Sequence, residues 1–284
     1  MRNMKYFDLK TPFEIYKDAV RRKNDGDEKN ELNSIETEME LCYNDYESHF
    51  CLNDLESLHR AQVGIDHQDV LIGLYGSQKK LVKDFRERYF EINPQTYNNL
   101  CPYCVINSAN TTDHILPKDL YAEYAINVKN LIPVCSECNS AKGEKVLDND
   151  GKRFIINYYT DLIPDVQFVN VDILVRNGAL IFEYFLSNPN NRIDAELYAL
   201  VKRHFDALRL LKRYKEKAIQ EFAEIKNSYL AEQFSSEDDY NIFAAKQIMK
   251  CDLDVHEYGR NHWKVVLLRS CAESPVFKHY ILSI

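Results

Sequence analysis

Eight cysteines stand in this chain of 284 residues, and four of them form two closely spaced pairs. Cys101 and Cys104 make the first CxxC pair, and Cys135 and Cys138 make the second. Four thiolates complete a tetrahedral zinc site and leave no open coordination position, so such a zinc is structural. Where thiols stay reduced, CxxC pairs are more typical of metal ligands than of disulfides. The spacing therefore predicts a structural zinc; a zinc ribbon without enzyme activity is the alternative.

Between and just after the two pairs lie residue types that can transfer a proton and hold a hard cation. His114 titrates near neutrality and can accept a proton from water, which makes it a candidate general base. Asp113 offers a carboxylate and Asn139 an amide oxygen, the ligands that Mg²⁺ or Mn²⁺ prefers. Neighbouring side chains on a strand point to opposite sides, so a bend or an approach from the strand end must bring Asp113 and His114 together.

These residues give the segment from Cys101 to Lys142 a resemblance to the HNH, or ββα-metal, endonuclease family and to its zinc-containing members. The matching positions are the acidic residue Asp113, the first motif residue His114, the middle residue Asn130 and the third residue Asn139. The chain therefore resembles an HNN variant. The resemblance implies hydrolysis of phosphodiester bonds, in which one cation contacts the scissile phosphate and the departing 3′ oxygen. A degenerate, inactive HNH domain is the alternative.

The remaining motif residues have supporting roles in this interpretation. In the family, the counterpart of Asn130 ties the loop and helps to orient the base, so we expect no chemistry from it. Lys142 lies one helical turn beyond Asn139, and we expect it to contact phosphate. Lys118 either does the same or lies on a solvated surface. The four scattered cysteines, which are expected to be buried apolar residues, are Cys42, Cys51, Cys251 and Cys271.

The pattern of apolar residues predicts a mostly helical α+β fold, with a small ββα-metal core and its four-cysteine zinc site. We predict an N-terminal helical region (1–95), the nuclease core (96–147), a β-hairpin segment (148–190) and a C-terminal helical region (191–284). The expected elements are a helix capped at Thr11, a polar loop over 24–33, a helix over 34–58 with Ser34 as its N-cap, a helix over 77–90, a hairpin turning at Arg176-Asn177-Gly178, a long helix over 193–229, and a helix that starts at Ser235-Ser236-Glu237 and runs to about Lys250.

The formal net charge of −8 is unfavourable for a protein that binds phosphates. The charge is unevenly distributed, however: residues 25–56 hold eleven Asp/Glu and one Lys, whereas residues 200–217 hold seven Lys/Arg and two Asp/Glu. The basic stretch is either a surface that follows a nucleic acid backbone or a solvated helix face. The acidic stretch is more typical of a solvated face than of a partner-binding one.

The sequence also favours a cytoplasmic protein that acts on nucleic acid. No apolar run approaches the roughly 20 residues of a membrane span, and residues 1–10 lack the apolar stretch of a signal peptide. The layout, including residues 154–167 after the core, resembles bacterial anti-phage defence HNH nucleases of the Septu-like and retron-associated kinds. That resemblance implies an effector that works beside an ABC-type ATPase. DNA is the expected substrate; RNA such as tRNA, or nucleic-acid binding without turnover, is the alternative.

Overall fold

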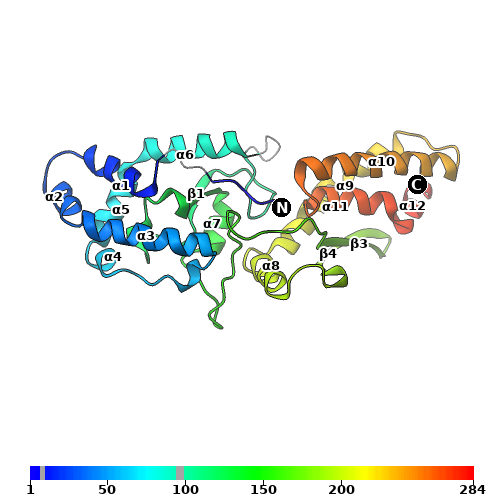
Figure 1. Cartoon of the computed structure of the whole chain (residues 1–284). Helices are drawn as coiled ribbons and strands as arrows, with labels where there is room; N and C mark the ends of the chain where they lie inside the picture. Colours follow the sequence, from blue (N-terminus) through cyan, green and yellow to red (C-terminus); the bar gives the residue numbers. More distant parts are fainter. Residues whose placement is uncertain (7–9, 94–98) are drawn as a thin grey trace. The chain divides into compact units, whose positions relative to one another are not determined.

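The computed structural model describes residues 1–6, 10–93 and 99–284 (Figure 1). The chain divides into two compact units. One, here called the N-terminal unit, comprises Asn3–Tyr103 and Asn107–Leu162; the other, the C-terminal unit, comprises Ile163–Ile284 with Met1–Arg2 and Cys104–Ile106. Both are dominated by helices, and each contains a two-stranded antiparallel sheet, which confirms the mostly helical α+β class. The finer division into four segments stays a prediction, and its boundary at 95/96 lies outside the described residues.

Helices make up most of the N-terminal unit. They are α1 (Pro12–Arg21), α2 (Asp27–Ser34), α3 (Glu36–Leu52), α4 (Gln62–Asp66), α5 (Gln68–Ser77), α6 (Lys79–Ile92) and α7 (Ser136–Lys142), with the short 3-10 helices η1 (Leu55–Ser57), η3 (Ala122–Tyr124) and η4 (Val128–Asn130). Thr11 caps α1 as predicted: its hydroxyl accepts from the Glu14 amide, and the Glu14 carboxylate accepts from the Thr11 amide. This reciprocal pair is a capping box.

Two predictions for this region are wrong. The polar stretch over 24–33, expected to be a loop, is helical from Asp27, because acidic residues occupy the first turn and Leu32 is fully buried in the core. Ser34 ends α2 and does not cap α3. The helix expected to reach about Leu58 ends at Leu52, where Asn53 adopts the left-handed conformation that terminates helices.

A short hairpin and a helix follow, as the motif predicts. Strand β1 (Thr111–His114) pairs antiparallel with β2 (Leu131–Val134), so that His114 lies opposite Leu131. Helix α7 starts directly after β2, with Cys135 at its N-cap position, and packs against β1. It ends at Gly143, which has a φ of 59°. This β1–β2–α7 arrangement is the small ββα core expected from the sequence.

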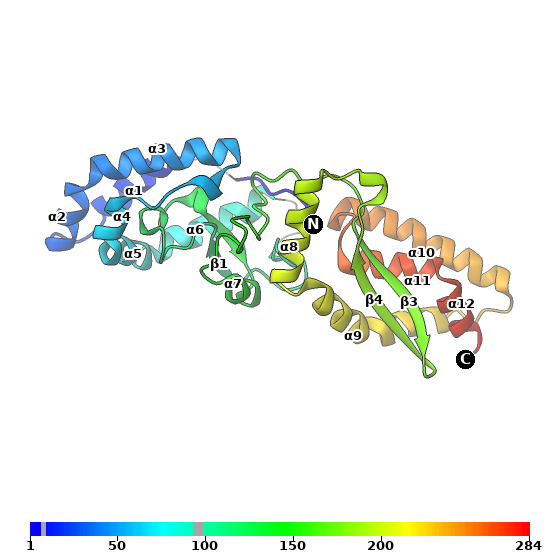
Figure 2. The ribbon, with the colours of Figure 1, turned by 90° about the horizontal axis from the view of Figure 1, so that it is seen from below.

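The C-terminal unit is built around the predicted hairpin, seen clearly in Figure 2. Strand β3 (Val169–Arg176) pairs with β4 (Ala179–Leu186), and both Asn177 and Gly178 have positive φ, as a two-residue turn requires. Helix α9 (Leu210–Leu230) packs against β4, and helix α11 (Trp263–Glu273) packs against β3. The helices are α8 (Ala195–Ala207), α9 (Leu210–Leu230), α10 (Glu237–Tyr258), α11 (Trp263–Glu273) and α12 (Pro275–Leu282), with the short 3-10 helix η5 (Pro189–Asn191).

The prediction of a single long helix over 193–229 is wrong, because α8 and α9 occupy that range. Arg209, between α8 and α9, has a left-handed φ of 52°, which breaks the helical path. Helix α10 starts within the expected Ser235-Ser236-Glu237 stretch, with Ser236 as its N-cap, and continues beyond Lys250 to Tyr258. No helix in the described part of the chain is both long and apolar enough to cross a membrane.

Candidate active site

The four paired cysteines form one cluster. Their Sγ atoms all lie within 4.8 Å of one another, and all four residues are buried. Tetrahedral zinc with Zn–S bonds of about 2.3 Å separates its sulfurs by about 3.8 Å, and the four Sγ atoms are close enough together to surround such an ion. Backbone amides support the sulfurs: the Cys138 amide donates to Cys135 Sγ and the Ile106 amide to Cys104 Sγ, each at 3.4 Å. The cluster can hold a zinc ion with no position left for substrate.

The scattered cysteines are mostly buried, as predicted. Cys42, Cys251 and Cys271 are buried, and burial raises the pKa of each thiol, to about 12 for Cys42 and Cys271 and about 11 for Cys251. The prediction is wrong for Cys51, which is exposed near the end of α3. Thiols with raised pKa values form little nucleophilic thiolate at neutral pH, so these three cysteines are inert packing residues.

His114 closes β1 and is held as a neutral imidazole. Its Nε2 lies 2.9 Å from the carbonyl oxygen of Ala125, which can only accept a hydrogen bond. Nε2 therefore carries the hydrogen, and Nδ1 keeps a free lone pair. Burial of the ring lowers the pKa of His114 to about 4. At neutral pH the ring is consequently uncharged and able to accept a proton at Nδ1.

Asn130 fixes the loop that supplies this acceptor. Its side chain is fully buried; its Oδ1 accepts from the Leu116 amide at 2.7 Å, and its Nδ2 donates to the carbonyls of Leu116 and Tyr124 at 2.9 and 3.2 Å. Tyr124 directly precedes Ala125, whose carbonyl holds His114. Asn130 thus ties together the two ends of the loop between β1 and β2. It does not line the cleft that holds His114, in agreement with a positioning role.

Asp113 lies in a buried polar cluster beside His114. Its two carboxylate oxygens accept from the Tyr103 hydroxyl at 2.8 Å and from Lys142 Nζ at 3.1 Å. Lys142 also donates to the His114 carbonyl at 2.7 Å, and its side chain is only 3% exposed. Burial raises the pKa of Asp113, and the neighbouring Lys142 cation partly offsets this effect. In this structure Lys142 compensates the Asp113 charge; its contact with phosphate stays a prediction.

The predicted catalytic residues meet at one open cleft of about 290 Å³. Asp113, His114, Asn139 and Lys142 all line it. Asp113 and His114 both reach the cleft, although neighbours on a strand point to opposite sides, because they are the last two residues of β1. Asn139 is half-buried, in the middle of α7. A carboxylate and an amide oxygen with room for water suit a hard divalent cation such as Mg²⁺, which keeps several waters. Asp113 and Asn139 would hold it. Lys118 lines the cleft too, paired with Asp119.

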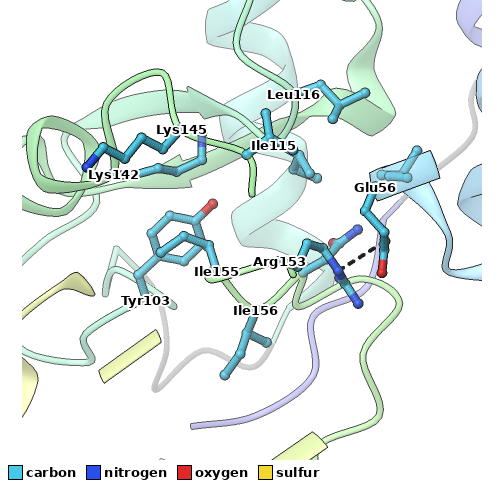
Figure 3. A pocket seen from close by; sticks show the side chains of 12 residues that line it. Glu56, Tyr103, Ile115, Leu116, Lys142, Lys145, Arg153, Ile155 and Ile156 are labelled. Atoms are coloured by element: carbon cyan, nitrogen blue, oxygen red, sulfur yellow. Dashed lines mark ion pairs between the residues drawn. The ribbon is translucent and has the colours of Figure 1, made fainter. Parts of the chain in front are cut away.

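A second, smaller cavity is lined by Tyr103 and Lys142, the two side chains that bind Asp113 (Figure 3). Tyr103 and Lys142 line one side of it, and an ion pair between Arg153 and Glu56 (3.1 Å) lies on another. Arg153 also pairs through both terminal nitrogens with the buried carboxylate of Asp161, at 2.9 and 3.0 Å. A bidentate pair of this kind is geometrically specific. It fixes the shape of the segment after α7, and the Arg153–Glu56 pair joins that segment to the short helix η1.

Several residues of the site carry no clear sequence signal. Tyr103, inside the CPYC run, binds Asp113, and Tyr75 of α5 packs its ring edge-on to the His114 ring with centroids 4.7 Å apart. Lys129, next to Asn130, forms a bidentate pair with Glu47 of α3 at 2.7 and 2.8 Å. The position of Tyr103 within the zinc pair could have pointed to a buried role. Tyr75 and Glu47 lie far from the motif in sequence, so only the fold brings them to it.

The basic stretch over 200–217 is not a continuous positive face. Arg213 is buried and donates to the Leu208 carbonyl, whereas Lys212 and Lys215 lie within 4 Å of the carboxylates of Glu216 and Glu183. Lys202 and Arg209 are exposed. Exposed pairs of this kind contribute little to stability and remain available to other ions. A role of this surface in nucleic acid binding stays a prediction.

Comparison with known proteins agrees with this geometry. The family model described as HNH endonuclease matches residues 101–145, so the chain contains an HNH endonuclease domain there, as the motif predicted. Protein ea31 of Escherichia phage lambda is 27% identical over 188 residues, which cover 62% of each chain. Septu protein PtuB of Bacillus thuringiensis is 39% identical over 51 residues, 16% of this chain and 20% of PtuB. The chain thus spans less than two thirds of either relative. No solved structure matches it significantly.

The cysteine cluster generates a first prediction about stability. Purified protein should contain about one zinc ion per chain, because binding to the four thiolates contributes directly to folding. Cys135→Ser should lose the zinc and lower the Tm, whereas Cys51→Ser, at an exposed thiol, should keep both. Elemental analysis and thermal melting measure the two quantities. A Cys135→Ser protein with unchanged Tm and no zinc would show that the cluster does not stabilise the fold through a metal.

The second prediction concerns the stability of Asn130 variants. It tests whether the hydrogen bonds donated by the Asn130 side chain, and not only its volume, stabilise the fold. Asn130→Asp is nearly isosteric, but it removes the Nδ2 donor and turns a charged oxygen toward the Leu116 and Tyr124 carbonyls. An unsatisfied buried polar group costs about 1–3 kcal/mol, and a charged one costs more. Asn130→Asp should therefore unfold at lower urea concentration than Asn130→Ala. If the aspartate variant were as stable as wild type, Nδ2 would not be the group that holds this loop.

Proposed function

We propose that this chain is a metal-dependent endonuclease that hydrolyses phosphodiester bonds of DNA. The observation that carries the proposal is the cleft in which a neutral His114 lies beside Asp113 and Asn139. A free imidazole nitrogen can take a proton from water, and oxygen donors next to it can hold a hard cation. The HNH endonuclease domain over residues 101–145 supports the same reaction class.

The proposed roles follow from the contacts of each residue. His114 accepts a proton from the attacking water at Nδ1, while the Ala125 carbonyl keeps the ring in that orientation. Asp113 and Asn139 would hold Mg²⁺ or Mn²⁺; when bound, such a cation stabilises charge on the scissile phosphate and the leaving 3′ oxygen. Lys142 neutralises Asp113 before a cation arrives. Tyr103 orients the same carboxylate by donating to its second oxygen.

The choice of DNA over RNA rests on the resemblance to DNA-cleaving HNH proteins and not on a sugar-binding group. Contacts to phosphate position a nucleic acid without identifying its sugar, so RNA such as tRNA is the second candidate. Nucleic-acid binding without turnover is the third. Side-by-side incubation of purified protein with supercoiled plasmid and with a tRNA mixture, in Mg²⁺ or Mn²⁺, distinguishes the three: nicked plasmid, shortened tRNA, or neither.

We further propose that the chain is the nuclease effector of a bacterial anti-phage defence system. The partial match to Septu protein PtuB supports this role, although it covers only 16% of the chain. The resemblance of the layout to Septu-like and retron-associated nucleases adds an ABC-type ATPase as the partner, and a cytoplasmic location fits such a pair. Affinity purification of the chain from its native host, followed by mass spectrometry, tests the partner: recovery without any ATPase would contradict it.

The catalytic roles generate a third prediction. His114→Gln keeps a side-chain donor toward the Ala125 carbonyl but has no basic nitrogen, so plasmid cleavage should fall by roughly 10²- to 10⁴-fold. Asn139→Ala should raise the Mg²⁺ concentration needed for activity. His59→Ala, at an exposed histidine of the same unit, is the matched control and should leave cleavage unchanged. Zinc content and Tm show that each variant is folded.

Metal removal completes this test. EDTA at a dose that leaves the zinc bound should stop cleavage by wild type, and added Mg²⁺ or Mn²⁺ should restore it. Wild-type rates in His114→Gln would exclude His114 as the base. Undiminished cleavage in EDTA would exclude the divalent cation and, with it, the roles of Asp113 and Asn139.

A further inference from the structure

We propose that Tyr75, on α5 and outside the HNH domain, is a substrate-contacting residue of the cleft, where its hydroxyl donates a hydrogen bond to a phosphate oxygen of the nucleic acid. This inference rests on the proposed function and deepens it by adding a residue from the N-terminal helices. The position of Tyr75 carries the proposal: it lines the same cleft as Asp113, His114 and Asn139. The family match begins only at residue 101, so it does not include Tyr75.

The ring of Tyr75 is held firmly beside the proposed base. It meets the His114 ring at 71° with centroids 4.7 Å apart, an edge-to-face arrangement. Its other side packs against the apolar cluster of Phe85, Val128 and Leu131. This cluster includes Leu131, the strand partner of His114. Tyr75 is therefore positioned by the same short sheet that positions the base.

Helix α5 itself is fastened to the loop that orients His114. Leu71 and Leu74 belong to the same buried cluster as Ala122 and Ile126, which flank the acceptor residue Ala125. At the start of the helix, the Gln68 side chain donates to the Asp119 carbonyl at 3.0 Å. These contacts connect α5 to the loop at both ends. The distance between the Tyr75 hydroxyl and the proposed reaction site is consequently set by packing.

The hydroxyl of Tyr75 has no protein acceptor within the described residues. Two other tyrosines of the unit differ in this respect: Tyr103 donates to Asp113, and Tyr46 donates to the Lys129 carbonyl. The Tyr75 side chain is half-buried, and burial raises its pKa above the ordinary value, with Asp113 adding to the effect and Arg86 opposing it. The group is thus a neutral O–H donor at working pH. A donor facing a cleft that binds a phosphodiester finds its acceptor in a non-bridging oxygen.

Two substitutions separate the hydroxyl from the ring. Tyr75→Phe removes only the oxygen and keeps the edge-to-face contact with His114. Tyr75→Leu removes both. Tyr280→Phe is the matched control, since Tyr280 is also half-buried but lies on α12 of the C-terminal unit. The measurements are cleavage of a short fluorescein-labelled DNA oligonucleotide in Mg²⁺, its binding by anisotropy in EDTA that leaves zinc bound, and the ¹H–¹⁵N spectrum of the His114 ring.

Tyr75→Phe should lower kcat/KM by roughly 10- to 100-fold, the usual contribution of a hydrogen bond to a charged group. It should also weaken oligonucleotide binding while leaving the His114 ring signals in place. Tyr75→Leu should lose at least as much and shift those signals. Tyr280→Phe should match wild type in every measurement.

The outcomes separate this proposal from the proposed function. If Tyr75→Phe cleaves and binds within twofold of wild type, the hydroxyl does not contact substrate and the proposal is overturned. If wild type binds the oligonucleotide but cleaves neither DNA nor RNA, the proposed function fails; weaker binding by Tyr75→Phe would then still support the contact. If wild type neither binds nor cleaves, both are overturned. Displaced His114 signals in Tyr75→Phe would assign any lost activity to the base and overturn the contact.

Discussion

The hydrogen bond from His114 Nε2 to the Ala125 carbonyl is the interaction on which the site depends. It fixes the tautomer, and so it decides which nitrogen can accept a proton. The carbonyl is itself placed by Asn130, whose amide bridges the two ends of the loop, and by α3, whose Tyr46 hydroxyl and Glu47 carboxylate bind Lys129 and the neighbouring backbone. Helix α3 and Asn130 therefore help to hold one backbone oxygen in place.

Burial favours the uncharged form of both neighbouring residues of the motif, but only Asp113 has a cation beside it that opposes this effect. For His114 it disfavours the charged form and keeps the ring neutral at physiological pH. For Asp113 burial would also favour the uncharged form, but Lys142 and Tyr103 both bind the carboxylate. Removing one member of a buried ion pair costs about 3–5 kcal/mol, so Lys142 is important for the fold whatever it does for the substrate. The cysteine cluster, which includes the N-cap of α7, ties these strands and this helix into one small core.

The part of this site that could be predicted from the sequence is the part encoded locally. The CxxC spacing predicts the zinc cluster, and the structure brings its four cysteines together. The motif also predicts a common site for Asp113, His114 and Asn139, and all three line one cleft. Contacts between distant segments could not be predicted in this way. Tyr75 reaches His114 only because α5 packs on the loop, and no spacing rule encodes that packing. Contacts between distant segments also decide parts of the fold. Helix α2 is helical although its sequence is polar, because Leu32 packs into the buried core cluster of this unit. The break between α8 and α9 could not be predicted from the periodicity, because apolar residues recur at helical spacing on both sides of Arg209. Arg209 adopts the left-handed conformation although it is not a glycine, so the residue type gives no sign of the break.

The central claim is that the fold presents His114 as a neutral imidazole with its hydrogen on Nε2 and a free Nδ1. Long-range ¹H–¹⁵N correlation spectra of ¹⁵N-labelled, zinc-loaded, magnesium-free protein measure this directly, with His114→Gln to assign the signals. The account predicts the Nε2–H tautomer at pH 7 and no uptake of a proton until the pH falls to about 4, since the folded pKa lies below the ordinary value. A His114 ring that is in the Nδ1–H form at pH 7, or that titrates near pH 6.5 like a solvated histidine, would contradict it.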